Sequence, residues 1–200
     1  MIRKIYNKNP NQKELEAVAG LLREGGVIIY PTDTLYAIGC DALNVRAVER
    51  VCEIKGCNPN KNFLSIICAD LSDLSTYAKV NNSIFKLMKR NIPGPFTFIL
   101  NATTSLPKIY KNRKEVGIRV PDNEIALELV KALGNPILST SVIDDREVEY
   151  ITDPELIHER YENQVDLVVD GGYGSATPST VVNCLGDEPE IVRQGAGVLK

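Results

Sequence analysis

The chain has 200 residues, of which 44% are apolar and 24% charged, a composition that excludes an intrinsically disordered protein. Its net charge of −3 argues against a protein that coats nucleic acid nonspecifically, because such binding relies on a strong basic excess. No repeat or change in composition marks a boundary, so we predict one domain over residues 1–200.

The first half of the chain predicts helices that alternate with short apolar strands. Apolar residues at helical spacing follow a capping Asn11 and end at Gly25-Gly26, which predicts a helix over 11–23. The same criteria predict a strand over 27–30, a helix over 44–54, a strand over 63–68 and a short helix that opens at Asp70.

In the second half, strands gather toward the C-terminus. We predict helices over 83–90, from Asn123 to Gly134 and over 153–162, where Asp153-Pro154 is a favourable start. The predicted strands are 96–100, 116–120, 137–141, 165–169, 179–183 and 190–193. This order indicates an α/β fold with a mixed sheet rather than a strictly doubly wound one.

Cysteine and histidine usage argues against a metal centre. The five cysteines form no Cys-x-x-Cys pair, and His158 is the single histidine, whereas a zinc site needs clustered ligands. We expect reduced thiols. The N-terminus lacks the apolar run of a signal peptide, and no stretch approaches the ~20 apolar residues of a membrane span. We therefore expect a cytoplasmic protein with no membrane partner.

Polar residues with short side chains follow the predicted strand 27–30. Ligands commonly bind at strand ends of α/β sheets, so Thr32 and Thr34 are candidates to contact a carboxylate or phosphate, and Tyr36 to form an apolar wall. The alternative is a hydrogen-bonded turn, because Pro, Thr and Asp favour turns. Both interpretations are open from the spacing.

Three cations and two hydroxyl-rich segments are further candidates. Lys55 ends a helix, where a solvated charge is the alternative to a phosphate partner. Arg119 lies in an apolar strand and either faces outward or has an anionic partner. Hydroxyls occur in Ser139-Thr140-Ser141 and Ser179-Thr180, and Arg193 lies near the C-terminus. Together they suit adenylation, in which catalysis is mostly positioning and neutralisation of phosphate charge.

Two charged runs have solvated loops as their favoured interpretation. The basic run contains Lys108, Lys111, Arg113 and Lys114, and its alternative role is contact with RNA phosphates. The acidic run, Asp144-Asp145 with Glu147 and Glu149, has magnesium binding as its alternative.

The order of seven segments between about Val18 and Ala196 resembles the YrdC/YciO family. They are Pro31-Thr32-Asp33-Thr34-Leu35-Tyr36, Lys55 after a helix, Pro93-Gly94-Pro95-Phe96-Thr97, Gly117-Ile118-Arg119-Val120-Pro121, Ser139-Thr140-Ser141, Ser179-Thr180-Val181-Val182 and Arg193-Gln194-Gly195. The resemblance implies a twisted YrdC-like mixed sheet with flanking helices and a large concave cleft. It also implies threonylcarbamoyl-AMP synthesis from L-threonine, bicarbonate and ATP with Mg²⁺, for modification of adenosine 37 in tRNA.

The resemblance, taken with the strand-end pattern, divides the candidate residues into two groups. We assign the substrate to Thr32, Thr34, Tyr36, Arg119 and Ser141, and the nucleotide to Lys55, Ser139, Thr140, Ser179 and Arg193. No residue is assigned as general base or metal ligand. Family members are also described as binding double-stranded RNA, so the resemblance adds tRNA or duplex RNA as candidate partners.

Three departures from the family pattern resemble its YciO-like branch. Cys57 occupies the place of the arginine in the synthase Lys-x-Arg pattern, Ile143 that of the asparagine in Ser-x-Asn, and Ala37 that of a glycine. The leading hypothesis is a synthase of weak or altered activity. The alternatives are a non-catalytic RNA- or ribosome-binding protein and an adenylating enzyme with another amino acid or carbamoyl donor.

Overall fold

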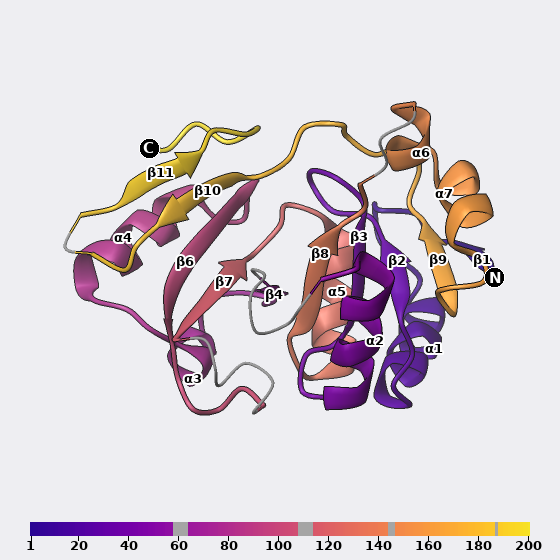
Figure 1. The fold of residues 1–200 in the computed structure, drawn as a ribbon, viewed down its shortest axis with the longest axis horizontal. Coiled ribbons are helices and arrows are strands. Elements are labelled where there is room, and N and C mark those ends of the chain that lie inside the picture. Colours follow the sequence, from indigo (N-terminus) through magenta and orange to yellow (C-terminus); the bar gives the residue numbers. More distant parts are fainter. Residues whose placement is uncertain (58–63, 108–113, 144–146, 187) are drawn as a thin grey trace.

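The computed structural model describes residues 1–57, 64–107, 114–143, 147–186 and 188–200. Within them the chain forms one twisted sheet with helices on both faces (Figure 1). The strands are β1 (Ile2–Lys4), β2 (Ile28–Tyr30), β3 (Ala37–Asp41), β4 (Ser65–Ile67), β5 (Ala78–Lys79), β6 (Phe96–Ala102), β7 (Glu115–Arg119), β8 (Ile137–Ser141), β9 (Leu167–Asp170), β10 (Thr180–Asn183) and β11 (Glu190–Arg193). The helices are α1 (Gln12–Arg23), α2 (Val45–Lys55), α3 (Leu74–Tyr77), α4 (Asn82–Asn91), α5 (Glu124–Leu133), α6 (Glu149–Thr152) and α7 (Pro154–Tyr161).

The sheet mixes parallel and antiparallel pairs, as the sequence predicts. Its order is β1-β9-β2-β3-β8-β4-β7-β6-β10-β11, and β5 pairs with β6. The β1–β9, β9–β2, β4–β7 and β6–β10 pairs are parallel, and the remaining neighbours are antiparallel. Neighbouring strands therefore come from distant parts of the chain, so the sheet itself brings the predicted motifs together.

Capping residues explain where most helices begin and end. The Asn11 side chain accepts hydrogen bonds from the amides of Lys13 and Glu14, and the Asn123 side chain accepts one from Ala126. Gly134 ends α5 with a φ of 78°, a left-handed conformation that glycine adopts without strain. These helix boundaries confirm the sequence predictions.

Several short elements escape the sequence patterns. The fully buried strand β3 lies directly after the Thr-rich turn, and β1, β5 and α6 are also additional to the predictions. The predicted helix start at Asp70 is wrong, because the Asp70 carboxylate accepts hydrogen bonds from Ser72 and holds a turn before α3 begins at Leu74. No helix in the described ranges is long and apolar enough to cross a membrane.

The two faces of the sheet carry separate apolar cores. Helices α1 and α5 pack on one face, which we call the α1/α5 face, against alternate residues of β2 and β9 and against Ile67 and Ile137. Helices α2, α4 and α7 pack on the other face, with Ile38, Ile66, Phe98, Ile118 and Leu138. In Figure 1, α1, α2 and α5 lie around the half of the sheet that holds β2, β3 and β8.

Gly39 of β3 permits close packing on the α1/α5 face. A Cβ at Gly39 would lie 2.5 Å from the Leu138 carbonyl oxygen and 2.7 Å from Cε1 of the Tyr30 ring. We expect Gly39→Ala to destabilise the fold by about 1–3 kcal/mol, because backbone cannot move aside easily. Urea denaturation measures this, and Gly20→Ala in α1 is the control. A Cβ there meets nothing within 4 Å, so equal destabilisation of the two variants would contradict the expectation.

Candidate functional site

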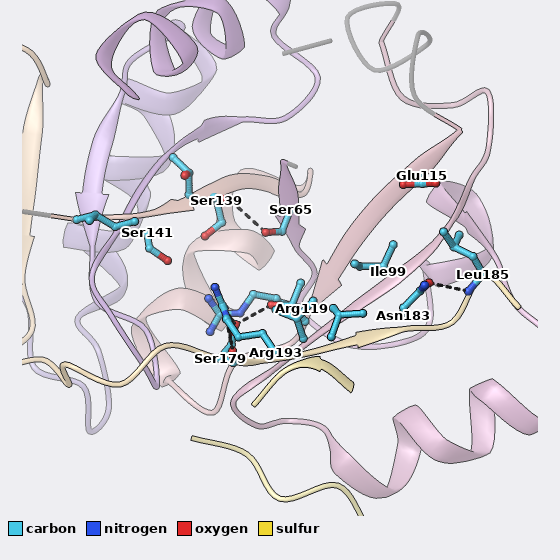
Figure 2. A pocket seen from close by; sticks show the side chains of 15 residues that line it. Ser65, Ile99, Glu115, Arg119, Ser139, Ser141, Ser179, Asn183, Leu185 and Arg193 are labelled. Carbon is cyan, nitrogen blue, oxygen red and sulfur yellow. Dashed lines mark hydrogen bonds between the residues drawn. The ribbon is translucent and has the colours of Figure 1, made fainter. Parts of the chain in front are cut away.

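The main cavity occupies the α1/α5 face of the sheet beyond the area that the two helices cover. Its volume is about 610 Å³. Figure 2 shows lining side chains from strands on the left of the view, such as Ser139, and on the right, such as Asn183, around one hollow. The lining residues are Ser65, Thr97, Ile99, Glu115, Arg119, Ser139, Thr140, Ser141, Ile143, Ser179, Val181, Asn183, Leu185, Val192 and Arg193.

Strand register explains why these residues converge. Ser139 pairs with Ser65, Ser65 with Gly117, Gly117 with Ile99, and Ile99 with Asn183, which forms a row across β8, β4, β7, β6 and β10. Because side chains alternate between the two faces of a strand, the residues two positions along belong to the same surface. The residues that alternate with them along each strand, such as Ile118, point to the other face of the sheet and belong to the apolar core there.

Gly117 lies in the middle of this row and has no side chain. A Cβ at this position would lie 3.0 Å from Cβ of Ser65 and 3.1 Å from Cγ2 of Thr97. The glycine in the Gly-Ile-Arg segment therefore allows the side chains of Ser65 and Thr97, which both line the cavity, to pack closely over this position.

Arg119 lies buried at one end of the cavity and is held by the turn after β2. Its Nη2 donates to Asp33 Oδ1 at 2.9 Å and to Thr34 Oγ1 at 2.9 Å. Asp33 in turn accepts from the amide of Asp122 at 3.0 Å. The side chains of Arg119 and Asp33 are 5% and 8% exposed. Arg119 thus faces away from Ile118, as alternation predicts, but has an anionic partner instead of pointing into solvent.

Burial acts in opposite directions on the two members of this pair. It raises the pKa of Asp33 above its ordinary value and lowers the pKa of Arg119, and in each case the partner's charge opposes the shift. Because an arginine guanidinium stays protonated in proteins, Arg119 supplies a fixed positive charge that favours the carboxylate form of Asp33. Repulsion from Arg193 further lowers the pKa of Arg119, so two guanidinium groups act on the same end of the cavity.

The other two predicted cations are anchored by backbone carbonyls at strand ends. Lys55 Nζ donates to the Ser141 carbonyl at 2.9 Å, and burial lowers its pKa. Arg193 donates from Nη2 and Nε to the Ser179 carbonyl at 2.8 and 3.2 Å, and Nη2 also donates to Ser179 Oγ at 3.2 Å. Ser179 Oγ lies 2.9 Å from Thr97 Oγ1, so hydroxyls and cations share one network.

The Thr-rich turn is largely satisfied within itself. Thr32 Oγ1 donates to the Leu35 carbonyl at 2.7 Å and accepts from the Thr34 amide at 3.1 Å. The Tyr36 hydroxyl donates to the Gly172 carbonyl at 2.6 Å and accepts from the Gly171 amide at 3.0 Å. This is the hydrogen-bonded turn that the sequence offered as the alternative, and it reaches the cavity through Arg119.

The structure therefore places the predicted site residues in two groups. Arg119, Ser139, Thr140, Ser141, Ser179 and Arg193 line the cavity. Lys55 and Thr34 contact lining residues from behind, while Thr32 and Tyr36 lie in the supporting turn. Their roles in binding stay predictions.

Sequence reasoning missed the opposite wall of the cavity. Ile99, Glu115, Val181, Asn183 and Leu185 line it, from β6, β7, β10 and the residues after β10. Their only signal in the sequence is the alternation of side chains along strands, and that pattern identifies a cavity only once the strand order is known.

Two of the three residues that depart from the family pattern, Cys57 and Ile143, are each the last described residue before a segment outside the described ranges. Ile143 lines the cavity and is 60% exposed, and Cys57 packs against the core beside α2. Ala37 is buried in β3, opposite Tyr30 and Ser141. The basic run is described only at Lys114, and Asp144 and Asp145 also lie outside the described residues.

Metal ligands are sparse in the described part of the chain. No group of three or more His, Cys, Asp or Glu residues there is arranged to hold a metal ion. Glu115 is the one carboxylate among the described lining residues of the cavity. This set fits a magnesium ion held mainly by substrate phosphates, which is how Mg²⁺ commonly binds at nucleotide sites.

The fold and the site together define a class of protein, an α/β protein with a polar, cationic cavity on an uncovered part of its sheet. Residues 20–195 match the Sua5/YciO/YrdC family model, which is described as "Telomere recombination". The chain belongs to this family, which confirms the resemblance seen in the seven sequence motifs.

Sequence and structure comparisons extend over nearly the whole chain. Protein YciO of Escherichia coli is 44% identical over 98% of this chain and 96% of its own. The crystal structure of E. coli YciO superposes with a TM-score of 0.91, over 99% of this chain and 97% of that one. The fold prediction, a twisted mixed sheet with flanking helices, is thereby confirmed.

Some longer relatives are named for an enzymatic activity. Threonylcarbamoyl-AMP synthase of Bacillus subtilis is 34% identical over 95% of this chain and 55% of its own length. Sua5 of P. abyssi, solved in complex with L-threonine, is 28% identical with a TM-score of 0.86, and the match covers 98% of this chain and 57% of that one. The family thus includes threonylcarbamoyl-AMP synthases.

Proposed function

We propose that this protein is a threonylcarbamoyl-AMP synthase-like nucleotidyltransferase that converts L-threonine, bicarbonate and ATP to threonylcarbamoyl-adenylate and pyrophosphate. The nitrogen of threonine forms a bond to the carbon of bicarbonate, and water leaves. An oxygen of the resulting carbamate then attacks the α-phosphorus of ATP, and pyrophosphate departs. The product would serve tRNA modification in the cytoplasm.

The pair of guanidinium groups at one end of the cavity carries this proposal. Arg119 and Arg193 are close enough for repulsion to lower the pKa of Arg119, and such an arrangement favours an anion between or beside them. Thr97, Ser139 and Ser179 surround the same end with hydroxyls. Phosphate and carboxylate oxygens are the acceptors that this donor set suits.

The opposite end of the cavity has a different character. Glu115 lies four residues before Arg119 on β7, about 13 Å along the strand. Ile99 and Leu185 add apolar surface toward this end, and Asn183 adds an amide. This polarity suits a nucleotide that places its phosphates near the arginines and its base against the apolar wall.

Each predicted residue then has a role in positioning or charge neutralisation. Arg119, oriented by Asp33 and Thr34, would hold the amino acid, while Ser139, Ser179 and Arg193 would hold phosphate oxygens. Lys55 would complete the phosphate contacts next to Ser141. Magnesium would neutralise phosphate charge and would be held mainly by the phosphate oxygens themselves. No side chain is assigned as general base.

The test is release of pyrophosphate from ATP in the presence of L-threonine and bicarbonate. At high enzyme concentration we expect release that requires both co-substrates. Release that is independent of threonine, or absent, would reject the proposal. A thermal-shift screen of other amino acids with ATP separates an enzyme with a different acyl donor, a candidate favoured by Ile143 at the cavity.

A further inference from the structure

Tyr30 is a buried tyrosine whose hydroxyl group has no role in the core. Its side chain is fully buried, and its hydroxyl forms no hydrogen bond of regular geometry with the described residues. A buried hydroxyl without a partner reduces stability, so it calls for an explanation.

The hydroxyl lies next to Ser139 at the back of the cavity. The Ser139 side chain lowers the pKa of Tyr30, although burial dominates and raises that pKa overall. Tyr30 therefore stays protonated at neutral pH and keeps a hydrogen to donate. Ser139 itself is 3% exposed and lines the cavity (Figure 2).

Strand register shows how Tyr30 reaches across the sheet. On β3, Ala37 pairs with Tyr30 of β2, and Gly39 pairs with Ser139 of β8. The Tyr30 ring crosses β3 where Gly39 has no side chain, since a Cβ there would lie 2.7 Å from the ring. Tyr30 and Ser139 thus meet on the α1/α5 face with a glycine between them.

Arg119 supplies a second unpartnered donor in the same region. Its Nη2 is used by Asp33 and Thr34, but its buried Nε has no hydrogen-bond partner among the described residues. Burial raises the pKa of Tyr30 overall, and Arg119 is near enough for its charge to oppose that rise. The Tyr30 hydroxyl and Arg119 Nε are therefore two buried donors that form no hydrogen bond with the described residues in this structure.

We infer that Tyr30 is a positioning residue: when an oxyanion occupies the cavity, the Tyr30 hydroxyl donates to Ser139 Oγ and so leaves the Ser139 hydroxyl hydrogen free to donate to that oxyanion. A serine hydroxyl has a single hydrogen, and occupation of its oxygen by Tyr30 directs that hydrogen elsewhere. Arg119 Nε provides a parallel donor to the same ligand. The inference rests on the proposed function in one respect, that the cavity takes a phosphate or carboxylate.

The experiment is a double-mutant cycle with Tyr30→Phe, Ser139→Ala and the double variant. ATP and L-threonine are titrated separately by calorimetry, so that the results show whether the oxyanion that depends on Tyr30 is a phosphate or a carboxylate. We expect Tyr30→Phe to weaken one of the two ligands about five- to tenfold, the effect of one hydrogen bond. In the Ser139→Ala background the Tyr30 change should have no further effect. The unfolding temperature of Tyr30→Phe should be unchanged or raised, since the ring is retained.

Tyr77→Phe is the matched control, because Tyr77 is half-buried beside another pocket. Unchanged affinity of Tyr30→Phe for both ligands, or effects that add in the double variant, would overturn the inference while pyrophosphate release still supports the proposed function. Conversely, Tyr30-dependent binding of ATP without any pyrophosphate release would refute the proposed function alone. A wild type that binds neither ligand would refute both.

Discussion

Arg119→Met is expected to reduce threonine-dependent pyrophosphate release about tenfold to a hundredfold and to destabilise the protein by about 3–5 kcal/mol. The activity falls because a charge-assisted donor is lost from the cationic end of the cavity. The stability falls because Asp33, whose side chain is 8% exposed, is left buried without its counter-charge. Steady-state kinetics and urea denaturation measure the two effects separately.

The double variant Asp33→Asn/Arg119→Met separates folding from function. Removing both charges avoids an unpaired buried carboxylate, so we expect stability to recover by at least half, while activity stays lost. The side-chain amide introduced by Asp33→Asn retains an oxygen that can accept from the Asp122 amide. Recovery of activity together with stability would show that Arg119 serves the fold and not the ligand. Arg50→Met, which breaks the half-exposed pair with Asp166, is the control for loss of an arginine elsewhere.

Cys57→Arg combined with Ile143→Asn is expected to raise pyrophosphate release about tenfold to a hundredfold, the effect of one added charge-assisted contact. Both changes restore residues of the synthase pattern that the sequence resembles. Ile143 lines the cavity, and Cys57 lies two residues after Lys55, whose Nζ contacts the Ser141 carbonyl. The gain should appear in the rate at saturating threonine as well as in the Michaelis constant for ATP.

Matched substitutions outside the cavity are the control for this gain. Val148 is 50% exposed and Asn163 is exposed, and neither lines the cavity. Val148→Asn with Asn163→Arg makes the same changes in polarity and charge, and we expect no increase. No gain in the Cys57/Ile143 variant, with its fold intact, would mean that these two positions do not limit the reaction. The proposal of another acyl donor would then gain weight.

Local chemistry is enough to predict most elements of this fold. The Asn11 and Asn123 caps, the Gly134 terminus and the Asp153-Pro154 start act within a few residues, so their effect is readable from the sequence. Strand β3 escapes prediction because its apolar run continues directly from the Thr-rich turn, without a polar break. The pairings that define the sheet join residues such as Ile2 and Val168, and no local pattern encodes them.

Some residues of the candidate site could likewise be predicted from the sequence, and others could not. The hydroxyl-rich strand end at Ser139 and the arginine in an apolar strand are unusual enough to stand out in the sequence. Glu115, Asn183 and Leu185 look like ordinary strand and turn residues, and they join the site because β6 pairs with both β7 and β10. The partner of Arg119 is equally hard to read from the sequence, since Asp33 looks like an ordinary turn residue.

The position of β10 and β11 has a consequence for how the protein matures. These last strands of the chain extend the sheet beyond β6, since β10 pairs with β6 and β11 with β10. With the residues beside them they supply Ser179, Val181, Asn183, Leu185, Val192 and Arg193 to the cavity. A nascent chain that has not yet emerged beyond β11 lacks one entire wall. A ligand that needs both walls can therefore bind and stabilise only the completed molecule, so occupancy of the cavity reports that folding has finished.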